Sequence, residues 1–162
     1  MLFRSGYTSA PNTFGPDKLW NYTIGQKAKL ADGKVTLNTS AFLIDWTDVQ
    51  TRLLLNCSYF FTDNKGKIRS KGLEVETMVK VTPEVTFSGF ASYTDSKARG
   101  DIPTVGAFDG NRTPYFPKWT ASASLFYDQP VGDNQSLHLS VSYQYTGEQF
   151  TTFNPFKTNI VN

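Results

Sequence analysis

The sequence alternates apolar and polar residues with a period of two, and it does so in six separate segments. The clearest is residues 73–81, where Leu73, Val75 and Val79 alternate with Glu74 and Glu76. Successive side chains of a β-strand point to opposite faces, so this period predicts strands with one apolar and one polar face. The other segments are residues 20–25, 35–44, 85–94, 119–128 and 137–146. We therefore predict an all-β chain.

The connections between these segments alternate between short and long. Residues 31–33, 82–84 and 132–134 form short breaks of turn-favouring residues. Residues 47–65 and 98–116 form long connections rich in Asp, Asn, Gly and Pro. Short turns at one end and long loops at the other are typical of outer-membrane β-barrels. We expect an antiparallel meander of about six to eight long strands, as a section of a transmembrane β-barrel.

Strand length and aromatic residues agree with a barrel. Most segments cover about ten residues, which a tilted strand needs to cross the hydrocarbon layer of a membrane. Aromatic side chains lie near the segment ends, as in the belts of such barrels. Those toward the long-loop end are Trp46, Tyr93, Trp119, Tyr143 and Tyr145, and Tyr127 lies at the short-turn end. A soluble β-sandwich binding module, with these aromatics packing across strands, remains the alternative.

Composition excludes several other classes. No stretch approaches the 18 or so consecutive apolar residues of a membrane-spanning helix. A net charge of +2 without a basic cluster excludes a nucleic-acid partner. The single cysteine, Cys57, excludes an internal disulfide, and one His far from one Cys offers no metal-ligand spacing. We predict no metal and no cofactor.

Catalysis also finds little support in the sequence. His138 stands near Ser140, but Asp95 and Asp101 belong to the opposite end of the predicted sheet. A nucleophile, a base and an orienting group must converge in space for nucleophilic catalysis. We predict no catalytic residues and no enzyme.

The alternation is disturbed at residues 69–72, where its phase places Arg69 and Lys71 on the apolar face. Gly72 could mark a bulge that resets the phase. Alternatively, the strand extends beyond the membrane, and the cations face water or headgroups. We favour the extended strand.

Five stretches resemble the barrel of TonB-dependent outer-membrane receptors. Residues 16–25 (PDKLWNYTIG) resemble the family's PE-x-LWNYE-x-G strand, with Thr23 in place of the usual acidic residue. Residues 41–50 (AFLIDWTDVQ) are similar to FYIDWxDIQ, and residues 67–76 (KIRSKGLEVE) to GKARSKGLELE. Residues 113–121 and 149–152 resemble RTPxxPKWxAS and QYTT. The stretches follow the family's order, and the resemblance covers residues 7–155.

The resemblance implies a fold, a function and partners. Family barrels have about 22 strands around an amino-terminal plug domain. The resemblance implies that residues 1–162 are a partial barrel domain without the plug and closing strands. The absence of an export signal in residues 1–13 agrees with this expectation. The implied function is import of a ligand such as a ferric siderophore across the bacterial outer membrane. The implied partners are outer-membrane lipid, the plug, the remaining strands and TonB. A passive porin-like or structural barrel is the alternative.

Two surfaces follow from this arrangement. The predicted lumen lining, suited to hydrogen bonding the plug, consists of Asn21, Thr23, Asn38, Ser40, Glu74, Glu76, Lys80, Ser88, Ser92, Ser122, Ser124, Ser140 and Gln144. The long loops supply exposed aromatic and cationic residues that could bind an anionic ferric chelate by stacking and charge. Packing of these side chains within the loops is the alternative. These candidate ligand contacts are Tyr59, Phe60, Arg99, Arg112, Tyr115 and Phe116, with Phe61 expected to be exposed beside them.

Overall fold

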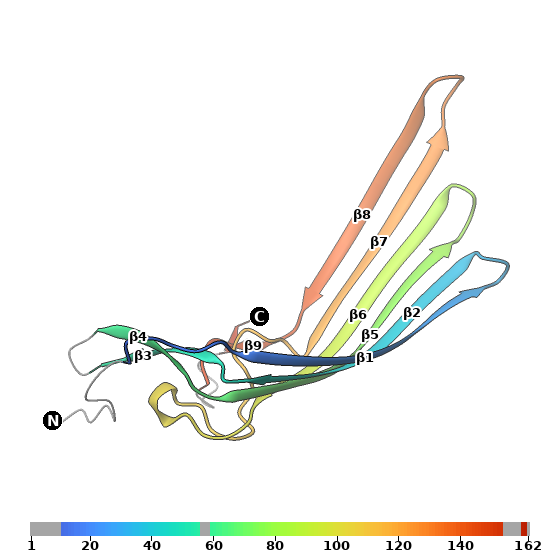
Figure 1. Ribbon diagram of the computed structural model, residues 1–162. Helices are drawn as coiled ribbons and strands as arrows, with labels where there is room; N and C mark the ends of the chain where they lie inside the picture. The colour runs from blue at the N-terminus through green and yellow to red at the C-terminus, as the bar shows by residue number, and fades with distance from the viewer. Residues whose placement is uncertain (1–10, 56–58, 154–159, 162) are drawn as a thin grey trace.

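The computed structural model describes residues 11–55, 59–153 and 160–161. Six long strands form one antiparallel sheet in the order β1-β2-β5-β6-β7-β8 (Figure 1). They are β1 (Lys18–Leu30), β2 (Val35–Thr47), β5 (Lys67–Lys80), β6 (Val85–Ala98), β7 (Trp119–Pro130) and β8 (Ser136–Thr146). The shorter elements are β3 (Gln50–Leu54), β4 (Phe60–Asn64), η1 (Pro103–Val105), β9 (Gln149–Phe150) and β10 (Ile160–Val161). The predicted all-β antiparallel meander is confirmed, and among the described residues the sheet is open between β1 and β8.

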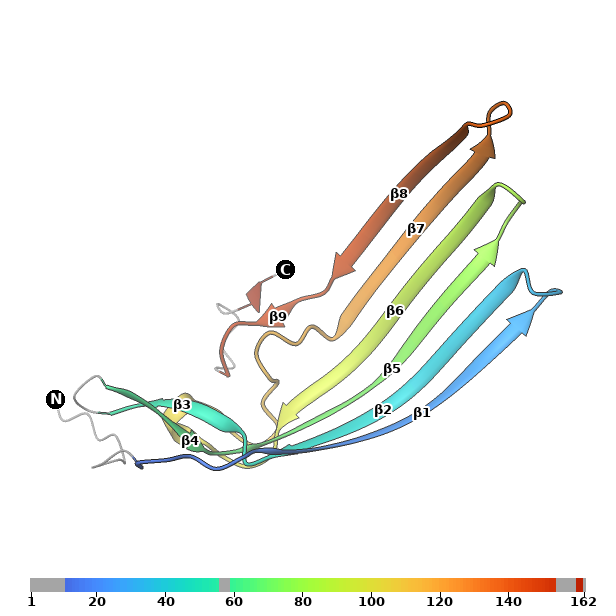
Figure 2. The ribbon, with the colours of Figure 1, turned by 45° about the horizontal axis from the view of Figure 1, so that its top comes forward.

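The three short connections lie together at one end of the sheet (Figure 2). Between β1 and β2, Ala31 and Asp32 have φ angles of 51° and 54°, and the Gly33 amide donates to the carbonyl of Leu30 at 3.1 Å. Left-handed residues of this kind suit tight turns between twisted strands. Between β5 and β6, the Thr82 hydroxyl accepts hydrogen bonds from the amides of Glu84 and of Val85, the first residue of β6. The predicted turn positions are confirmed, and we call this the short-turn end.

One face of the sheet is apolar. Register places Ile24, Ala41, Leu73, Tyr93 and Trp119 in one row across β1, β2, β5, β6 and β7. Large apolar side chains on this face are exposed, as shown by Ile24 at 77%. The buried apolar residues of the described chain are instead Val49, Leu53, Phe61, Ala98 and Ala107, all near the long-loop end. The sheet thus presents an extended apolar surface that the described chain does not cover.

The opposite face is polar. Asn38 donates to Glu76 at 3.0 Å and Ser40 to Glu74 at 3.1 Å, linking β2 to β5. The residues predicted as a polar lining share this face, because cross-strand pairs such as Ser40 with Glu74 and Glu74 with Ser92 keep one register across the sheet. That part of the prediction is confirmed.

Strand β5 continues without interruption through the segment where the alternation was disturbed. It pairs residue for residue with β2 and with β6 through this segment, so the proposed bulge at Gly72 is wrong and the strand is continuous. That this part of the strand lies beyond the membrane stays a prediction. The glycine is required for packing instead. A Cβ on Gly72 would lie 2.2 Å from the Tyr93 carbonyl oxygen and 2.6 Å from Cζ of Phe42. The Phe42 ring therefore covers the bare backbone of its cross-strand partner.

The aromatic residues at the long-loop end divide between the two faces. Tyr93 and Trp119 pack on the apolar face with ring centroids 4.9 Å apart. Trp46 pairs with Leu19 and Ile68, one position out of phase with that face, so its placement in the same belt was wrong. Its indole N–H donates to the carboxylate of Asp17 at 2.7 Å. Within the described residues, no helix has both the length and the apolar character to cross a membrane.

Candidate ligand-binding site at the long-loop end

The first long connection, between β2 and β5, folds into the hairpin β3–β4 (Figure 2). Leu53 and Phe61 face each other across the two strands and are only 2% and 8% exposed. The expectation that Phe61 is exposed was therefore wrong, because strand alternation turns it inward while Phe60 points outward. The hairpin itself was not predicted, since its two strands are only five residues long.

The second long connection, residues 99–118, is held against the polar face of the sheet. Ser70 donates to the Ser96 hydroxyl at 2.7 Å, and Ser96 donates to the Thr113 hydroxyl at 2.9 Å. All three side chains belong to buried residues. The Thr113 amide also donates to the Ser96 carbonyl at 3.0 Å, and Ala107 is completely buried. This chain of hydroxyls fixes the connection to β5 and β6.

A cavity of about 290 Å³ lies between the hairpin and this connection. Its walls include Thr51 and Arg52 of β3, Lys65 after β4, and Ile102 and Thr113 from the second connection. The lining is thus mixed, with apolar side chains and hydroxyl groups beside the three cations Arg52, Lys65 and Lys67. Such a cavity suits a ligand that combines negative charge with apolar or aromatic surface.

Arg52 and Lys65 were missed by the sequence prediction. The Arg52 guanidinium lies 4.1 Å from the centre of the Phe60 ring, and both residues are exposed. Lys65 lies 3.4 Å from the carboxylate of Asp63. The alternation of residues 50–54 could have placed Arg52 on the same side of a strand as Leu54. This alternation was not recognised as a strand, because residues 47–65 as a whole are rich in turn-favouring residues.

The candidate contacts Arg112, Tyr115 and Phe116 come together with the segment after β8. Arg112 lies over the Phe150 ring at 4.9 Å, and its side chain is only 16% exposed. It also pairs with Glu148 at 3.5 Å. Tyr115, which is 67% exposed, donates its amide to the Phe150 carbonyl at 2.8 Å. Arg112 thus joins two outer segments, while the Tyr115 and Phe116 rings remain exposed.

Tyr59 and Phe60 lie on the separate hairpin, where they are 64% and 50% exposed. Of the six candidate contacts, the structure therefore places two on the hairpin and three beside the segment after β8. The remaining one, Arg99, lies on a different surface.

Arg99 belongs to the apolar-face side of the sheet. Its amide pairs with the Lys67 carbonyl, which continues the β5–β6 register by one residue. Asp45, beyond the apolar row at the end of β2, is bound through two oxygens to Arg69 at 2.6 and 3.0 Å. The Arg69 hydrogen bond lowers the pKa of Asp45, and the positive charges of Arg69 and Arg99 lower it further. Arg99 is therefore close enough to Asp45 to influence its ionisation.

Other chemically active groups are sparse in the described part of the chain. His138 pairs through Nδ1 with Asp128 on the neighbouring strand, a partner that sequence analysis missed. The pair lies near the short-turn end, and its side chains are 71% and 60% exposed. No described hydroxyl is hydrogen bonded to its imidazole. The described residues contain no cluster of three metal-ligating side chains, and Cys57 lies outside them.

Comparison with known proteins identifies the family. The family model described as TonB dependent receptor-like, beta-barrel matches residues 2–159. The chain belongs to this family. The resemblance found in the sequence is confirmed, and the open six-stranded sheet corresponds to part of the family's barrel wall.

Individual relatives of the family agree. The ferrichrome outer membrane transporter/phage receptor of Escherichia coli strain K12 is 26% identical over 139 residues, which cover 86% of this chain and 18% of that protein. The ferrioxamine B receptor of Salmonella typhimurium is 27% identical over 134 residues, covering 83% and 18%. The crystal structure of the ferric yersiniabactin uptake receptor FyuA from Yersinia pestis matches with a TM-score of 0.67 and 20% identity, covering 85% and 20%. The chain thus spans about a fifth of the length of these relatives.

Proposed function

We propose that this chain forms part of the wall of a bacterial outer-membrane receptor that imports a ferric siderophore. The observation that carries the proposal is the two-faced sheet of a TonB-dependent receptor family member, which is apolar on one face and hydrogen bonded through polar side chains on the other. An apolar outer face and a polar inner face are what a strand wall needs between lipid and an aqueous or plugged lumen. Receptors for ferrichrome and ferrioxamine B among the relatives favour an iron chelate as the substrate.

Residues 1–162 would then be one section of a larger barrel domain. The outer edges of β1 and β8 present backbone groups with no partner strand among the described residues. Lipid cannot satisfy such groups, so in a membrane further strands must pair with them. The polar face would contact a plug domain through groups such as Glu74 and Glu76, and TonB would supply the energy coupling.

The cavity at the long-loop end is the best candidate for ligand contact. It opens among Arg52, Lys65 and Thr113, and Arg52 lies over the exposed ring of Phe60. A guanidinium stacked on an aromatic ring offers both charge and a flat surface to an anionic chelate. Tyr59, Tyr115 and Phe116 expose further rings at the same end of the sheet.

Uptake of radioactive iron by cells carrying the complete receptor tests the function. We expect saturable uptake of a ferric siderophore that stops when TonB is deleted. Uptake that rises linearly with concentration and does not depend on TonB would instead support the passive porin-like alternative.

Substitution in the cavity tests the site. Arg52→Gln removes the guanidinium that would contact an anionic chelate, and one such contact at an exposed site contributes about 1 kcal/mol, so the apparent affinity should fall about fivefold. Lys27→Gln is the matched control, because it removes a cation from β1 on the polar face, near the short-turn end. Equal affinities for the two variants would refute the assignment of the cavity.

A further inference from the structure

A cluster of charges lies on the apolar-face side of the sheet, beyond the last apolar row at the long-loop end. Strand register places six cations and two carboxylates on this side: Lys18, Lys67, Arg69, Lys71, Lys97 and Arg99, with Asp45 and Asp95. Asp45 is bound by Arg69, and Asp95 lies 3.0 Å from Lys97. Lys71 is exposed and has no ion-pair partner within the described residues. The cluster therefore keeps an excess of positive charge.

The spacing within this cluster suits a phosphate group. Arg69 and Lys97 are direct cross-strand partners, so their Cα atoms lie about 5 Å apart. Lys71 follows Arg69 on the same face of β5, about 7 Å along the strand. A phosphate carries up to two charges and three acceptor oxygens, so it can accept hydrogen bonds from several cations at once.

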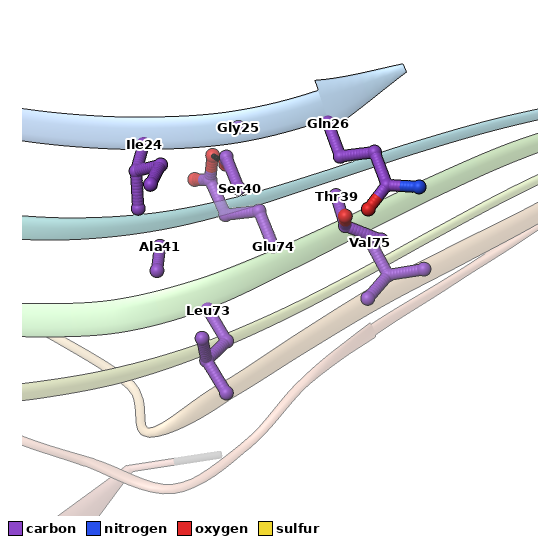
Figure 3. A pocket seen from close by; sticks show the side chains of 9 residues that line it. All are labelled: Ile24, Gly25, Gln26, Thr39, Ser40, Ala41, Leu73, Glu74 and Val75. Atoms are coloured by element: carbon purple, nitrogen blue, oxygen red, sulfur yellow. Dashed lines mark hydrogen bonds between the residues drawn. The ribbon is translucent and has the colours of Figure 1, made fainter. Parts of the chain in front are cut away.

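Two hollows lie directly below these cations on the apolar face. One, of about 300 Å³, is lined by Leu73, Val75, Ala91, Tyr93 and Trp119. The other, of about 500 Å³, lies on the far side of β5, and its lining joins Ile24 and Ala41 to the same two β5 residues (Figure 3). Small side chains at Ala41 and Ala91 leave the depressions, while larger apolar neighbours form their walls. Lys71 precedes Leu73 by one position on this face.

We propose that this surface binds a lipid whose phosphate headgroup has a net negative charge, with the phosphate on Arg69, Lys71 and Lys97 and its acyl chains in the two hollows. The proposal rests on the proposed function, because that function places the apolar face in a membrane. The charges and the apolar hollows are continuous on one side of the sheet, which matches an amphiphile and not a free anion. Arg99 contributes charge to this surface, which gives it a role distinct from contact with an imported ligand.

Binding of defined lipids to the complete barrel, purified in a zwitterionic detergent, tests the proposal. The probes are dimyristoyl phosphatidic acid, dimyristoyl phosphatidylcholine and inorganic phosphate, with affinities measured by native mass spectrometry or intrinsic fluorescence. We expect phosphatidic acid to bind most tightly. Lys71→Gln and Lys97→Gln should each weaken it about fivefold, since one basic residue contributes roughly 1 kcal/mol at an anionic lipid surface. Lys80→Gln, on β5 but on the polar face and at the other end, is the matched control.

Two further variants separate the parts of the site. Asp45→Asn should tighten binding of phosphatidic acid, because it releases Arg69, and a folding defect cannot produce a gain. Ala91→Leu should weaken phosphatidic acid binding by filling one hollow. The proposal would be overturned if inorganic phosphate bound as tightly as phosphatidic acid. It would also be overturned if the Lys71→Gln and Lys80→Gln barrels had the same affinity for phosphatidic acid.

The two proposals fail in distinguishable ways. A protein that shows no compact, heat-modifiable barrel on electrophoresis would contradict the proposed function. A compact barrel that binds the three probes equally would contradict the lipid site alone.

Discussion

Replacing Gly72 by alanine should strongly destabilise the barrel wall. Gly72 lies on the polar face of β5 between Phe42 of β2 and Thr94 of β6. Its added Cβ would lie 2.2 Å from the Tyr93 carbonyl oxygen, where an ordinary carbon–oxygen contact is about 3.3 Å. Relief therefore requires about 1 Å of movement between two hydrogen-bonded strands, which a flexible side chain cannot supply.

The expected cost follows from that geometry. Overpacking of an interior typically costs about 1–3 kcal/mol, and a clash with backbone belongs at the upper end of that range. Gly89→Ala is the matched control, because Gly89 is also in the middle of a strand. Its added Cβ would meet only side-chain atoms, Phe87 at 3.0 Å and Thr77 at 3.4 Å. Those atoms can shift by a few tenths of an ångström, so we expect a cost below about 1 kcal/mol.

The assay is the urea midpoint of the complete barrel in lipid vesicles, followed by loss of the compact band on unheated gels. Gly72→Ala should lower the midpoint clearly, and Gly89→Ala only slightly. In a Phe42→Leu background the Gly72→Ala penalty should shrink by about 1 kcal/mol, because the ring contact at 2.6 Å is removed while the backbone contact stays. Equal midpoints for the two glycine variants would refute this account of the glycine.

Three other changes give equally specific outcomes. Ser96→Ala breaks the hydroxyl chain and leaves buried groups without a partner, at about 1–3 kcal/mol, so residues 99–118 should become sensitive to limited proteolysis, whereas Ser88→Ala should not have this effect. Arg112→Lys should also increase proteolysis there, since lysine lacks the flat guanidinium that covers Phe150; protection equal to wild type would contradict this role. The lowered pKa of Asp45 means that its contribution to stability is present above its ordinary value of 3.8 and is lost as the pH falls through the lower folded value. The stability difference between wild type and Asp45→Asn, measured by urea midpoints, should therefore be constant near neutral pH and disappear in strong acid.

The architecture of the sheet was largely predictable because period two fixes which residues share a face. Once β5 pairs with β2 at Ser40 and Glu74, every other pair in the two strands follows. The turns were predictable for a local reason, since residues such as Asp32 and Gly33 tolerate positive φ. Trp46 shows the limit of this reasoning. Its position at the strand end suggested a belt, but a displacement of one residue moved it to the other face.

The candidate site was less predictable, because contacts between loops do not follow a period. Arg112 and Arg99 looked equivalent in sequence, as cations within one long connection. Arg112 lies over the ring of Phe150, a residue nearly forty positions later, whereas Arg99 continues the register between β6 and β5. Arg52 was hidden in a short strand, whose alternation covers too few residues to stand out from a loop. Only the folded arrangement separates these three roles.

Strand β5 explains how two binding surfaces can coexist at one end of the sheet. Arg69 and Lys71 point to the apolar-face side, whereas Ser70 and Gly72, which alternate with them, face the polar side. There Ser70 supports the connection that lines the cavity. Adjacent residues therefore serve opposite surfaces. A substitution at Lys71 should change the affinity for lipid but not the affinity for the imported ligand. A substitution at Ser70 should change the affinity for the imported ligand but not the affinity for lipid. If Lys71→Gln changed both affinities in an intact barrel, the two faces would be coupled through the strand, and a site-by-site account of either surface would be insufficient.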